Sequence, residues 1–504
     1  MDAVDGALVL VGFMGAGKTS GVRSLAAQLD CQPLDSDHEL ERELGESVES
    51  FFDREGEVAF REREEAAVLE LLDREDSAVI ALGGGALESE RVREALRRHV
   101  VVHLEVDPED AWRRASGKGR PLARDPGRFR ELYEQRHPLY DSIADAVLPP
   151  SDRGGPLRAL PALAALRDAP AGTRMVWAHT RSRDYPVFFG RGLIASGFLF
   201  PSEGRRFTVT DETVAGIHGA GDAAIKPGET AKNLVSAEWV LRKMAEAGMG
   251  HDDVVIAMGG GVVGDLGGFC AAVYQRGIRH VQVPTTLVAQ VDSAYGGKTG
   301  VDLPEGKNYV GSYHQPSAVL VDPSALETLP REELAAGYAE VVKTALIAGG
   351  PLWARVRDGR DPDEAVVVGC LRTKLAVVAE DERDSGRRQV LNLGHTVAHA
   401  IEAATGFARY RHGEAVGIGL LAALRLSGRD AIRKEVAGLF AERGLPLSFG
   451  GASPAEVVEL VGRDKKRRGG DVPFVLVQAP GEVTYGHQVD PADLLAAVEE
   501  VHAG

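Results

Sequence analysis

Residues 392–417 read NLGHTVAHAIEAATGFARYRHGEAVG. Four polar residues recur here at intervals of three, four and three: Asn392, His395, His399 and Glu402. On a helix they would share one face among Ala, Val and Ile, and His412 heads the next apolar run. Histidine is the commonest protein ligand for zinc, so we predict a metal site, and spacing alone pairs His395 with His399. The alternative is a solvated helix face with one or two structural histidines.

The chain has 504 residues, too many for one ordinary core, so we expect two or three domains. Hydrophobic residues make up 44% of it, which favours folded domains over disorder. No apolar run approaches the roughly 20 residues needed to cross a bilayer. The N-terminus carries acids where a signal peptide would carry bases. We therefore expect a cytoplasmic protein without a membrane partner.

Charge and cysteine content narrow the partners and the compartment. The net charge of −17 argues against nucleic-acid binding but leaves room for local positive pockets that hold anionic substrates. Cys31, Cys270 and Cys370 are far apart and form no C-x-x-C pair. We expect reduced thiols, with no disulfide framework and no cysteine zinc site.

A phosphate-binding motif opens the chain. Residues 7–11 (ALVLV) predict a strand, residues 12–19 (GFMGAGKT) fit G-x-x-x-x-G-K-[ST], and a helix is expected to follow. Such a loop cradles phosphates, the lysine adds a point charge, and the Thr19 hydroxyl can hold Mg²⁺. The predicted ATP-binding residues here are Gly12, Gly15, Ala16, Gly17, Lys18, Thr19 and Ser20. A chance glycine-rich turn is the alternative.

Further polar motifs follow downstream. Asp35 and Asp37 come after a short predicted strand, where Asp35 would help organise Mg²⁺ and Asp37 would accept from a substrate hydroxyl. Arg61 lies on a predicted charged helix, and the alternative there is a solvated helix face with salt bridges. Three glycines end the next strand, allowing backbone to approach a ligand: Gly83, Gly84 and Gly85. Arg120 lies in a predicted lid loop and Arg136 on a late helix.

The order of these motifs, with R-P-L and R-x-P-x-Y, resembles shikimate kinase over residues 1–150. The resemblance implies that shikimate is held by Asp37, Arg61, Arg136 and the triple glycine. The forked donors of Arg61 and Arg136 would grip its carboxylate, and Arg120 would close over the phosphates. The chain reads RPLA where the family usually reads R-P-L-L, a change in the lid.

Composition and pattern suggest the domain organisation. Residues 151–173 are rich in Pro, Gly and Ala and contain one helical candidate, so we expect a linker with a helix that docks on either neighbour. Beyond it we expect an α/β domain at 174–325 and a mainly helical domain at 326–504, to which the resemblance described below gives NAD binding and metal and substrate binding.

Two glycine-rich stretches mark the second unit. A predicted strand (residues 254–258) runs into Gly259, Gly260 and Gly261, with Asp265 on the next helix. This indicates a Rossmann-type phosphate site, although the spacing is not G-x-G-x-x-G and a tight turn is the alternative. Residues 281–316 then carry lysines among glycines, which suits a phosphorylated, polyhydroxylated ligand; a mobile surface loop is the alternative. The residues concerned are Asp292, Lys298, Lys307 and Asn308.

Residues 174–504 resemble 3-dehydroquinate synthase through GGGVVGDLGGF, PTTLVAQVDSAYGGKTG, GKN, AEVVK, LNLGHTVAHAIE and HGEAVGIG. By this resemblance the metal ligands are Glu340, His395 and His412, with Zn²⁺ or Co²⁺, while His399 moves to the substrate side. NAD would be held by Asp211, Glu229, Lys232, Gly259, Gly260, Gly261, Asp265, Thr285, Thr286, Lys298, Lys307 and Asn308. The substrate pocket would be lined by Asp292, Lys298, Lys307, Asn308, Lys343, Lys374, Arg388, Asn392 and either Lys465 or Lys466.

The two resemblances imply a fold and two reactions. The fold is an α/β P-loop kinase domain with a parallel sheet, fused to a Rossmann-like α/β domain and a mostly α-helical domain. Because dehydroquinate synthases are often dimers, the resemblance also implies a homodimer through the synthase unit. One reaction transfers the ATP γ-phosphoryl group to shikimate, with Lys18 and Asp37 at the site. The other converts 3-deoxy-arabino-heptulosonate 7-phosphate to 3-dehydroquinate, releasing phosphate without consuming NAD.

Three alternatives and three departures stay open. The second unit could be another sugar-phosphate cyclase or a metal-dependent polyol dehydrogenase, and the whole chain could be a nucleotide-binding regulator without turnover. Tyr295 and Asp302 replace usual family residues, and GHTVAHA replaces G-H-T-x-G-H-A. We expect that none of these departures touches a presumed ligand, so they bear on affinity more than on identity.

Overall fold

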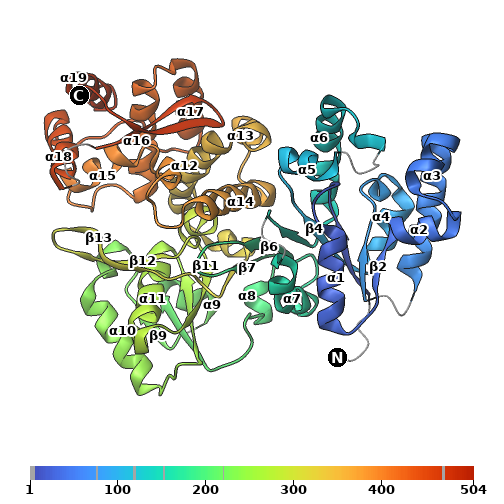
Figure 1. The fold of residues 1–504 in the computed structure, drawn as a ribbon. Coiled ribbons are helices and arrows are strands. Elements are labelled where there is room, and N and C mark those ends of the chain that lie inside the picture. Colours follow the sequence, from blue (N-terminus) through green and yellow to red (C-terminus); the bar gives the residue numbers. More distant parts are fainter. Residues whose placement is uncertain are drawn as a thin grey trace. The chain divides into compact units, whose positions relative to one another are not determined.

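The computed structural model describes residues 6–74, 78–116, 121–150, 154–219, 221–467 and 472–503, without the side chains of 121 and 463–467. The chain forms two compact units (Figure 1). The first comprises Met1–His179 and Asp184–Gly190, and the second comprises Thr180–Arg183 and Arg191–Gly504. No helix in the described ranges combines the length and apolar character that a membrane span requires.

The first unit is built on a sheet in the order β2-β3-β1-β4-β5-β6-β7, parallel except for the last pair. Its strands are almost wholly apolar because helices cover both faces of a parallel sheet. The strands are β1 (Leu8–Val11), β2 (Pro33–Asp35), β3 (Val79–Ala81), β4 (Val100–Leu104), β5 (Ala146–Leu148), β6 (Arg174–Ala178) and β7 (Tyr185–Phe189). The helices are α1 (Lys18–Leu29), α2 (Ser36–Leu44), α3 (Val48–Asp73), α4 (Glu90–Leu96), α5 (Pro108–Ala115), α6 (Pro126–Ile143) and α7 (Gly155–Ala165).

The segment expected to be a linker belongs to the first unit. Its helical candidate forms α7, which buries Ala159, Ala162 and Leu163 and packs on α1. Strand β6 then pairs in parallel with β5, in the register Ala146↔Met175. The first unit therefore continues through β7 to Gly190, apart from Thr180–Arg183, and does not end at 173–174, because these pairings extend the first sheet beyond the linker.

The second unit begins with a parallel sheet in the order β14-β11-β10-β8-β9. The strands are β8 (Arg206–Asp211), β9 (Ala223–Ile225), β10 (Val254–Gly259), β11 (Arg279–Pro284) and β14 (Ala318–Val321), and β12 (Lys298–Leu303) pairs with β13 (Gly306–Tyr313) as a hairpin. The helices of this half are α8 (Leu193–Ser196), α9 (Glu212–His218), α10 (Leu234–Glu246) and α11 (Gly261–Val273). This confirms the predicted Rossmann-like α/β half.

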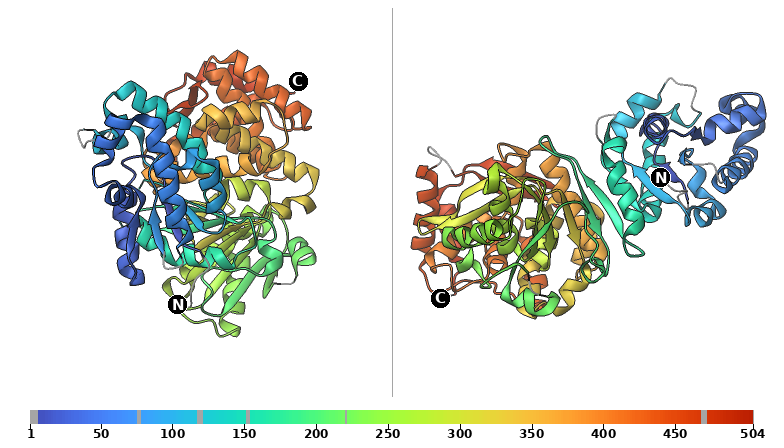
Figure 2. Two further views of the ribbon diagram at one scale, coloured as in Figure 1. Left: turned by 90° about the vertical axis from the view of Figure 1, so that its right-hand side faces the viewer. Right: turned by 90° about the horizontal axis from the view of Figure 1, so that it is seen from below.

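The rest of the second unit is mainly helical, as predicted, and lies to one side of the sheet (Figure 2, left). Its helices are α12 (Arg331–Ala348), α13 (Gly350–Arg357), α14 (Glu364–Glu380), α15 (His395–Ala404), α16 (His412–Leu426), α17 (Asp430–Glu442), α18 (Pro454–Arg467) and α19 (Pro491–Glu499). A hairpin of β15 (Phe474–Ala479) and β16 (Glu482–His487) completes it. Helix α16 is apolar almost all round and buried, so it forms the centre on which α12 and α15 pack.

Candidate functional sites

The glycine loop after β1 turns back over the start of α1. Gly12, Gly15 and Gly17 have φ values of 142°, 88° and 93°, which only glycine adopts easily. Lys18 Nζ donates to the carbonyl oxygens of Gly12 (2.7 Å) and Phe13 (3.3 Å), so its ammonium group lies across the loop. The loop and the start of α1 thus present backbone N–H groups and one cation to the same space.

Thr19 and Asp35 meet beside this loop. The Thr19 hydroxyl donates to Asp35 Oδ2 (2.7 Å), while Asp35 Oδ1 accepts from the Asp37 backbone N–H (3.1 Å) and caps α2. A hydroxyl and a carboxylate in this arrangement are hard oxygen ligands suited to Mg²⁺.

The triple glycine lets polar side chains approach the backbone closely. A Cβ atom on Gly83 would lie 2.6 Å from Glu64 Oε1 and 2.7 Å from Asp37 Oδ1. A Cβ atom on Gly85 would lie 2.1 Å from Arg61 Nη1. Any side chain at these positions would push Asp37 or Arg61 aside, so the glycines bring both predicted residues to one place.

Arg61 and Arg136 face a carboxylate of the chain itself. Glu88 Oε1 lies 2.7 Å from Arg136 Nη2, and Glu88 Oε2 lies 3.6 Å from Arg61 Nε. Arg136 is 4% exposed, whereas the Glu88 side chain is 45% exposed. Glu88 and Arg136 line a cavity of about 330 Å³. The two arginines therefore form a carboxylate-binding pair, with Glu88 between them.

Sequence reasoning missed two acids in this pocket. Glu64 is buried and its Oε2 lies 2.5 Å from Arg61 Nη1; burial raises the pKa of Glu64, against the attraction of Arg61. Glu88 follows the triple glycine by three residues, but no local pattern reveals that it pairs with an arginine 48 positions later. The predicted lid residue Arg120 lies outside the described residues.

In the second unit, three parallel strands end at one edge of the sheet. Asp211 ends β8, where its Oδ1 caps α9 by accepting from the N–H groups of Thr213 (2.9 Å) and Val214 (3.0 Å). Gly259 ends β10 and its carbonyl accepts from the Thr285 N–H (3.0 Å) after β11. The glycine turn, the threonine pair and Asp211 thus line the carboxyl edge, the usual ligand position in such sheets.

Close packing explains the two glycines that follow. A Cβ atom on Gly260 would lie 3.0 Å from Thr286 Cγ2, and one on Gly261 would lie 3.1 Å from Ser293 Oγ. Small residues therefore leave room for a ligand phosphate at the start of α11.

A charge network joins the remaining NAD-binding candidates. The buried Lys232 Nζ lies 2.8 Å from Glu229, 3.2 Å from Asp265 and 3.8 Å from Asp302. Burial would lower the pKa of Lys232, but these carboxylates raise it. Burial raises the pKa of Asp265 to about 6.

Two hairpin residues complete this network. Lys307 Nζ lies 3.5 Å from Glu229, and Asn308, at φ 56°, donates its backbone N–H to Asp302 (2.7 Å). The expectation that the departures leave the presumed ligands untouched is therefore wrong for Asp302, because the hairpin carries it to Lys232. Tyr295 is buried, and its hydroxyl donates to the Gln290 carbonyl (2.7 Å).

Glu340, His395 and His412 converge from three helices. Glu340 Oε1 lies 3.5 Å from Nε2 of both His395 and His412. His395 begins α15, His412 begins α16, and Glu340 lies within α12. Of the two histidines paired on spacing, His395 faces this carboxylate, whereas His399 is exposed and belongs to a second group with Glu402 and His412.

Two glycines, Gly413 and Gly394, determine how these helices pack and where α15 begins. A Cβ atom on Gly413 would lie 1.9 Å from the Ala336 carbonyl oxygen, so α16 touches α12 through a glycine. Gly394, at φ 80°, starts α15 and separates it from Asn392, which ends a short 3-10 turn. Asn392 therefore does not share the helix face of His395 and Glu402.

The donor set fits a borderline divalent metal. Glu340 is fully buried, and its Oε1, the oxygen that faces both imidazoles, accepts no hydrogen bond from any described residue. Burial would raise the pKa of Glu340, but Lys343 and the two imidazoles hold it well below its usual range. One anionic oxygen and two imidazole nitrogens suit Zn²⁺ or Co²⁺ with open positions for a substrate.

Cationic candidates surround this group. Lys343 Nζ lies 2.5 Å from Glu340 and 3.9 Å from Asp292, and Lys374 pairs with the other Asp292 oxygen. Asp292 lies in a π-turn, Ala289–Ser293, a feature common at functional sites. Burial lowers the pKa of Lys374 to about 8, against the attraction of Asp292 and with added repulsion from Lys343. Lys298 is half-exposed and pairs with Asp384 (2.5 Å).

The Arg388 side chain binds backbone carbonyls and does not face an open pocket. It is 2% exposed, and its guanidinium donates to the carbonyls of Glu382 (2.5 Å) and Gly296 (3.1 Å). The side chains of Lys465 and Lys466, at the end of α18, lie outside the described residues.

Comparisons with known proteins agree with the geometry of both units. Residues 14–154 match shikimate kinase, residues 222–336 match the 3-dehydroquinate synthase N-terminal family, and residues 337–467 match its C-terminal family. The 3-dehydroquinate synthase of Halorhodospira halophila is 40% identical over 353 residues, 65% of this chain and 99% of that protein.

Two solved structures are similar to the second unit. ValA, the 2-epi-5-epi-valiolone synthase from Streptomyces hygroscopicus subsp. jinggangensis, was solved with NAD⁺ and Zn²⁺; it is 25% identical, covers 64% of this chain and 98% of its own, and has a TM-score of 0.57. A 2-deoxy-scyllo-inosose synthase complexed with carbaglucose-6-phosphate, NAD⁺ and Co²⁺ is 22% identical, covers 65% and 99%, and has a TM-score of 0.58, which shows a shared fold.

Proposed function

The chain belongs to the 3-dehydroquinate synthase family and carries a shikimate kinase domain before it, so it is a bifunctional shikimate-pathway enzyme, and we propose how its residues divide the two reactions. We assign phosphorylation of shikimate to residues 1–150, NAD binding to the parallel sheet of the second unit up to residue 325, and metal and substrate binding to 326–504. Because the relatives are named 3-dehydroquinate synthase, we favour heptulosonate phosphate as the substrate over the substrates of other cyclases.

The synthase proposal rests on the convergence of Glu340, His395 and His412 beside a cluster of lysines. These three residues would hold Zn²⁺ or Co²⁺, which supplies Lewis acidity at the substrate hydroxyl. NAD⁺ would lie at the carboxyl edge of the parallel sheet and supply a hydride acceptor that is restored within the cycle. Its binding residues would be Asp211, Glu229, Lys232, Gly259, Gly260, Gly261, Asp265, Thr285, Thr286, Lys307 and Asn308.

The chain's own side chains would bind and orient the heptulosonate phosphate. Lys343 and Lys374 offer cations to its carboxylate and hydroxyl oxygens, while Asp292 holds both ammonium groups in place. Lys298 and His399, both exposed, would reach the phosphate. Arg388 would act by holding the Gly296 backbone.

In the kinase, ATP would supply the phosphoryl group, and Mg²⁺ would offset the negative charge of the phosphates. Thr19 and Asp35 would hold Mg²⁺, while Lys18 and the loop N–H groups bind the phosphates. Asp37 would accept the proton of the shikimate hydroxyl. Arg61 and Arg136 would bind the shikimate carboxylate in the place that Glu88 takes in this structure.

Replacing Glu88 with Gln should lower the KM for shikimate by about three-fold, the size expected for losing a partly exposed competing ion pair. The physical reason is that Glu88 Oε1 lies 2.7 Å from Arg136 and competes with the substrate carboxylate. Steady-state kinase kinetics would measure this, with the exposed Glu90→Gln as the matched control. A higher KM in Glu88→Gln would show that Glu88 helps binding.

Synthase kcat/KM should fall as the pH rises through about 8. Lys374 has a pKa lowered to about 8, so it is charged below this pH and neutral above it, where it binds an anionic substrate less well. A pH profile of kcat/KM would show the fall, and Lys374→Arg should remove it. A profile that stays flat to about pH 9.5 would exclude this role.

The direct test of the synthase is phosphate release from the heptulosonate phosphate with NAD⁺ and Zn²⁺ and without ATP. We expect release that needs both NAD⁺ and metal, forms 3-dehydroquinate and accumulates no NADH. Accumulating NADH on a polyol would instead indicate a dehydrogenase, and binding without turnover a regulator. The kinase test is ADP formation that depends on shikimate.

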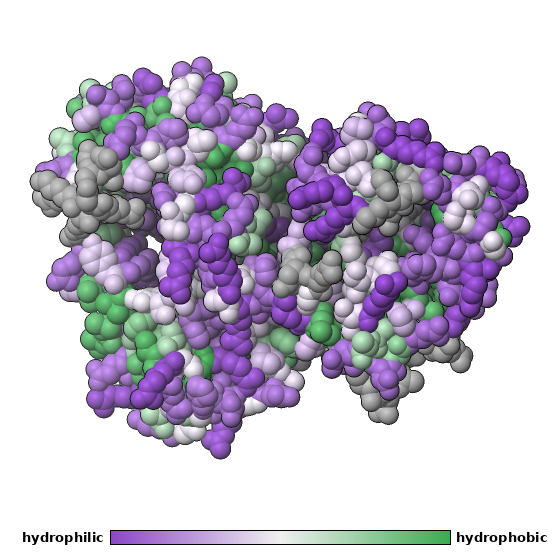
Figure 3. Space-filling model, viewed as in Figure 1, coloured by the Kyte–Doolittle hydropathy of each residue, from purple (hydrophilic) through white to green (hydrophobic). Residues whose placement is uncertain are grey.

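We further propose a homodimer formed through the synthase unit. Helix α10 exposes Leu234, Val235 and Trp239 by 46%, 78% and 40%, and a hydrophobic area lies over this helix (Figure 3). Such patches commonly mark interaction sites. Light scattering should show a dimer for wild type and for the exposed control Lys434→Glu, and a monomer for Val235→Glu. A wild-type monomer at micromolar concentration would contradict the proposal.

Small molecules are the other expected partners, and the net charge of −17 argues against nucleic acid as a partner. A cytoplasmic location is consistent with three free cysteines, of which Cys270 and Cys370 are buried.

A further inference from the structure

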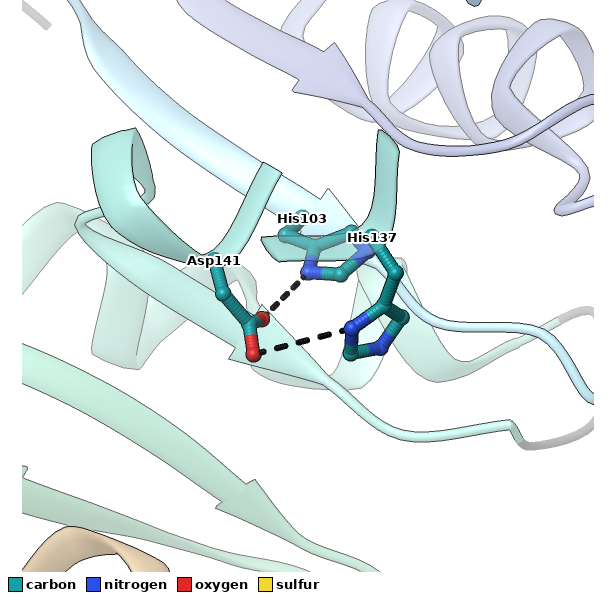
Figure 4. A group of neighbouring side chains, drawn as sticks. All are labelled: His103, His137 and Asp141. Atoms are coloured by element: carbon teal, nitrogen blue, oxygen red, sulfur yellow. Dashed lines mark hydrogen bonds and ion pairs between the residues drawn. The ribbon is translucent and has the colours of Figure 1, made fainter. Parts of the chain in front are cut away.

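Two histidines and an aspartate meet in the first unit (Figure 4), and none of the three belongs to the proposed ATP-binding residues. His103 Nδ1 lies 2.9 Å from Asp141 Oδ1, and His137 Nδ1 lies 4.0 Å from Asp141 Oδ2. One ligand atom from each of the three residues lies within 4.8 Å of the others. One carboxylate therefore faces two imidazole nitrogens.

The backbone places these residues securely. His103 is on β4, opposite Val11 of β1, and is 1% exposed, an unusual residue in a strand whose neighbours are all apolar. His137 and Asp141 are four residues apart on α6 and so lie on one face. Their side chains are 29% and 23% exposed. The group thus has one deep donor and two donors that an ion from solvent can reach.

The surroundings supply a second layer of contacts. His137 Nε2, the nitrogen that points away from Asp141, lies 3.8 Å from Glu105 Oε1. A metal-binding histidine typically directs its second nitrogen at a carboxylate, which orients the ring and makes it a better ligand. The centre of the His137 ring also lies 5.4 Å from that of Tyr133, and the centre of the His103 ring lies 5.4 Å from that of Tyr140. Each imidazole ring therefore packs beside an aromatic ring.

We propose that His103, His137 and Asp141 bind a divalent transition-metal ion of the Zn²⁺ or Co²⁺ class. Two imidazole nitrogens and one carboxylate oxygen suit such an ion and do not suit Mg²⁺, which prefers oxygen ligands. Metal–ligand bonds of about 2.0–2.2 Å place the donor atoms roughly 3.3 Å apart. His103 Nδ1 and Asp141 Oδ1, now 2.9 Å apart, would need to separate slightly, and the His137 side chain would need to rotate toward the ion. The site is independent of the proposed synthase metal and adds a second ion to each chain.

The position of this ion gives it a structural role in the kinase. It would tie α6 to β4, and α6 also carries Arg136 of the acceptor pocket and Tyr140, whose hydroxyl donates to the Gly84 carbonyl (2.6 Å). His103 also lies next to the first residue of the phosphate loop, because a Cβ atom on Gly12 would lie 3.5 Å from His103 Cδ2.

Metal stoichiometry of the full chain tests the proposal. Chelator-stripped protein is loaded with Co²⁺, desalted and analysed by elemental mass spectrometry and visible absorption. Wild type and the exposed-histidine control His251→Asn should bind two ions per chain, while His137→Asn and Asp141→Asn should each bind one. The double variant His395→Ala/His412→Ala should also keep one ion, held at His103, His137 and Asp141.

Two results would overturn the proposal: one ion per wild-type chain that is retained in His137→Asn, or no ion in His395→Ala/His412→Ala. Circular dichroism separates a lost ligand from a lost fold. The combined variant His137→Asn/His395→Ala/His412→Ala should bind none, and a retained ion there would place the second site elsewhere.

Discussion

Glu340→Gln should lower 3-dehydroquinate formation by about 1,000-fold, which corresponds to about 4 kcal/mol of lost transition-state stabilisation. Glutamine keeps the shape but removes the anionic ligand that faces both His395 and His412 at 3.5 Å. It also leaves the buried Lys343 without the carboxylate at 2.5 Å. The measurement is phosphate release from the heptulosonate phosphate together with bound metal per chain.

The same preparation supplies the controls. Glu333→Gln changes a half-exposed glutamate on the same helix, paired with Arg411, and should leave both activities within about two-fold of wild type. Shikimate phosphorylation should be unaffected in Glu340→Gln, which shows that the protein is folded. Full synthase turnover in Glu340→Gln would remove the metal assignment.

Arg136→Ala should lower kinase kcat/KM for shikimate by about 100-fold, or about 3 kcal/mol, the range for losing one side of a buried charge pair. Arg136 is 4% exposed and its guanidinium points at the Glu88 carboxylate, so it is oriented for a carboxylate before substrate arrives. The loss should appear mainly in the KM for shikimate, with the KM for ATP little changed. Steady-state kinetics with each substrate varied would separate the two.

Because Arg136→Ala leaves Glu88 facing an emptied position, Arg136→Met/Glu88→Gln tests the same loss without an unpaired charge. Arg130→Ala, on the same helix but 61% exposed, is the matched control. A normal shikimate KM in both Arg136 variants would place the carboxylate elsewhere.

Local patterns were enough where the chemistry depends on neighbouring residues. The phosphate loop, Lys18 and Thr19 lie within one strand–loop–helix stretch, so their spacing already sets their geometry. The same holds for the glycines after β3 and at the end of β10, where the lack of side chains already predicted that the backbone could approach a ligand. The fold class of both units also followed from motifs and their order.

Other features depend on contacts between distant segments. Spacing paired His395 with His399, but the packing of α12 and α15 on α16 turns His395 and His412 toward Glu340. Glu88 reaches Arg136, and Asp302 reaches Lys232, only because the chain folds back on itself.

The sequence alone determined the two-part organisation, the phosphate loop and the residue types available for metal, NAD and substrate, because these depend on local backbone geometry and on composition. Spacing alone had paired His395 with His399, whereas the resemblance had already grouped His395 and His412 with Glu340. Tertiary structure decided that Arg388 gives its donors to backbone carbonyls and that His103 meets His137 and Asp141. The physical reason is that side-chain packing across helices and strands sets these distances, and no periodicity along the chain encodes it.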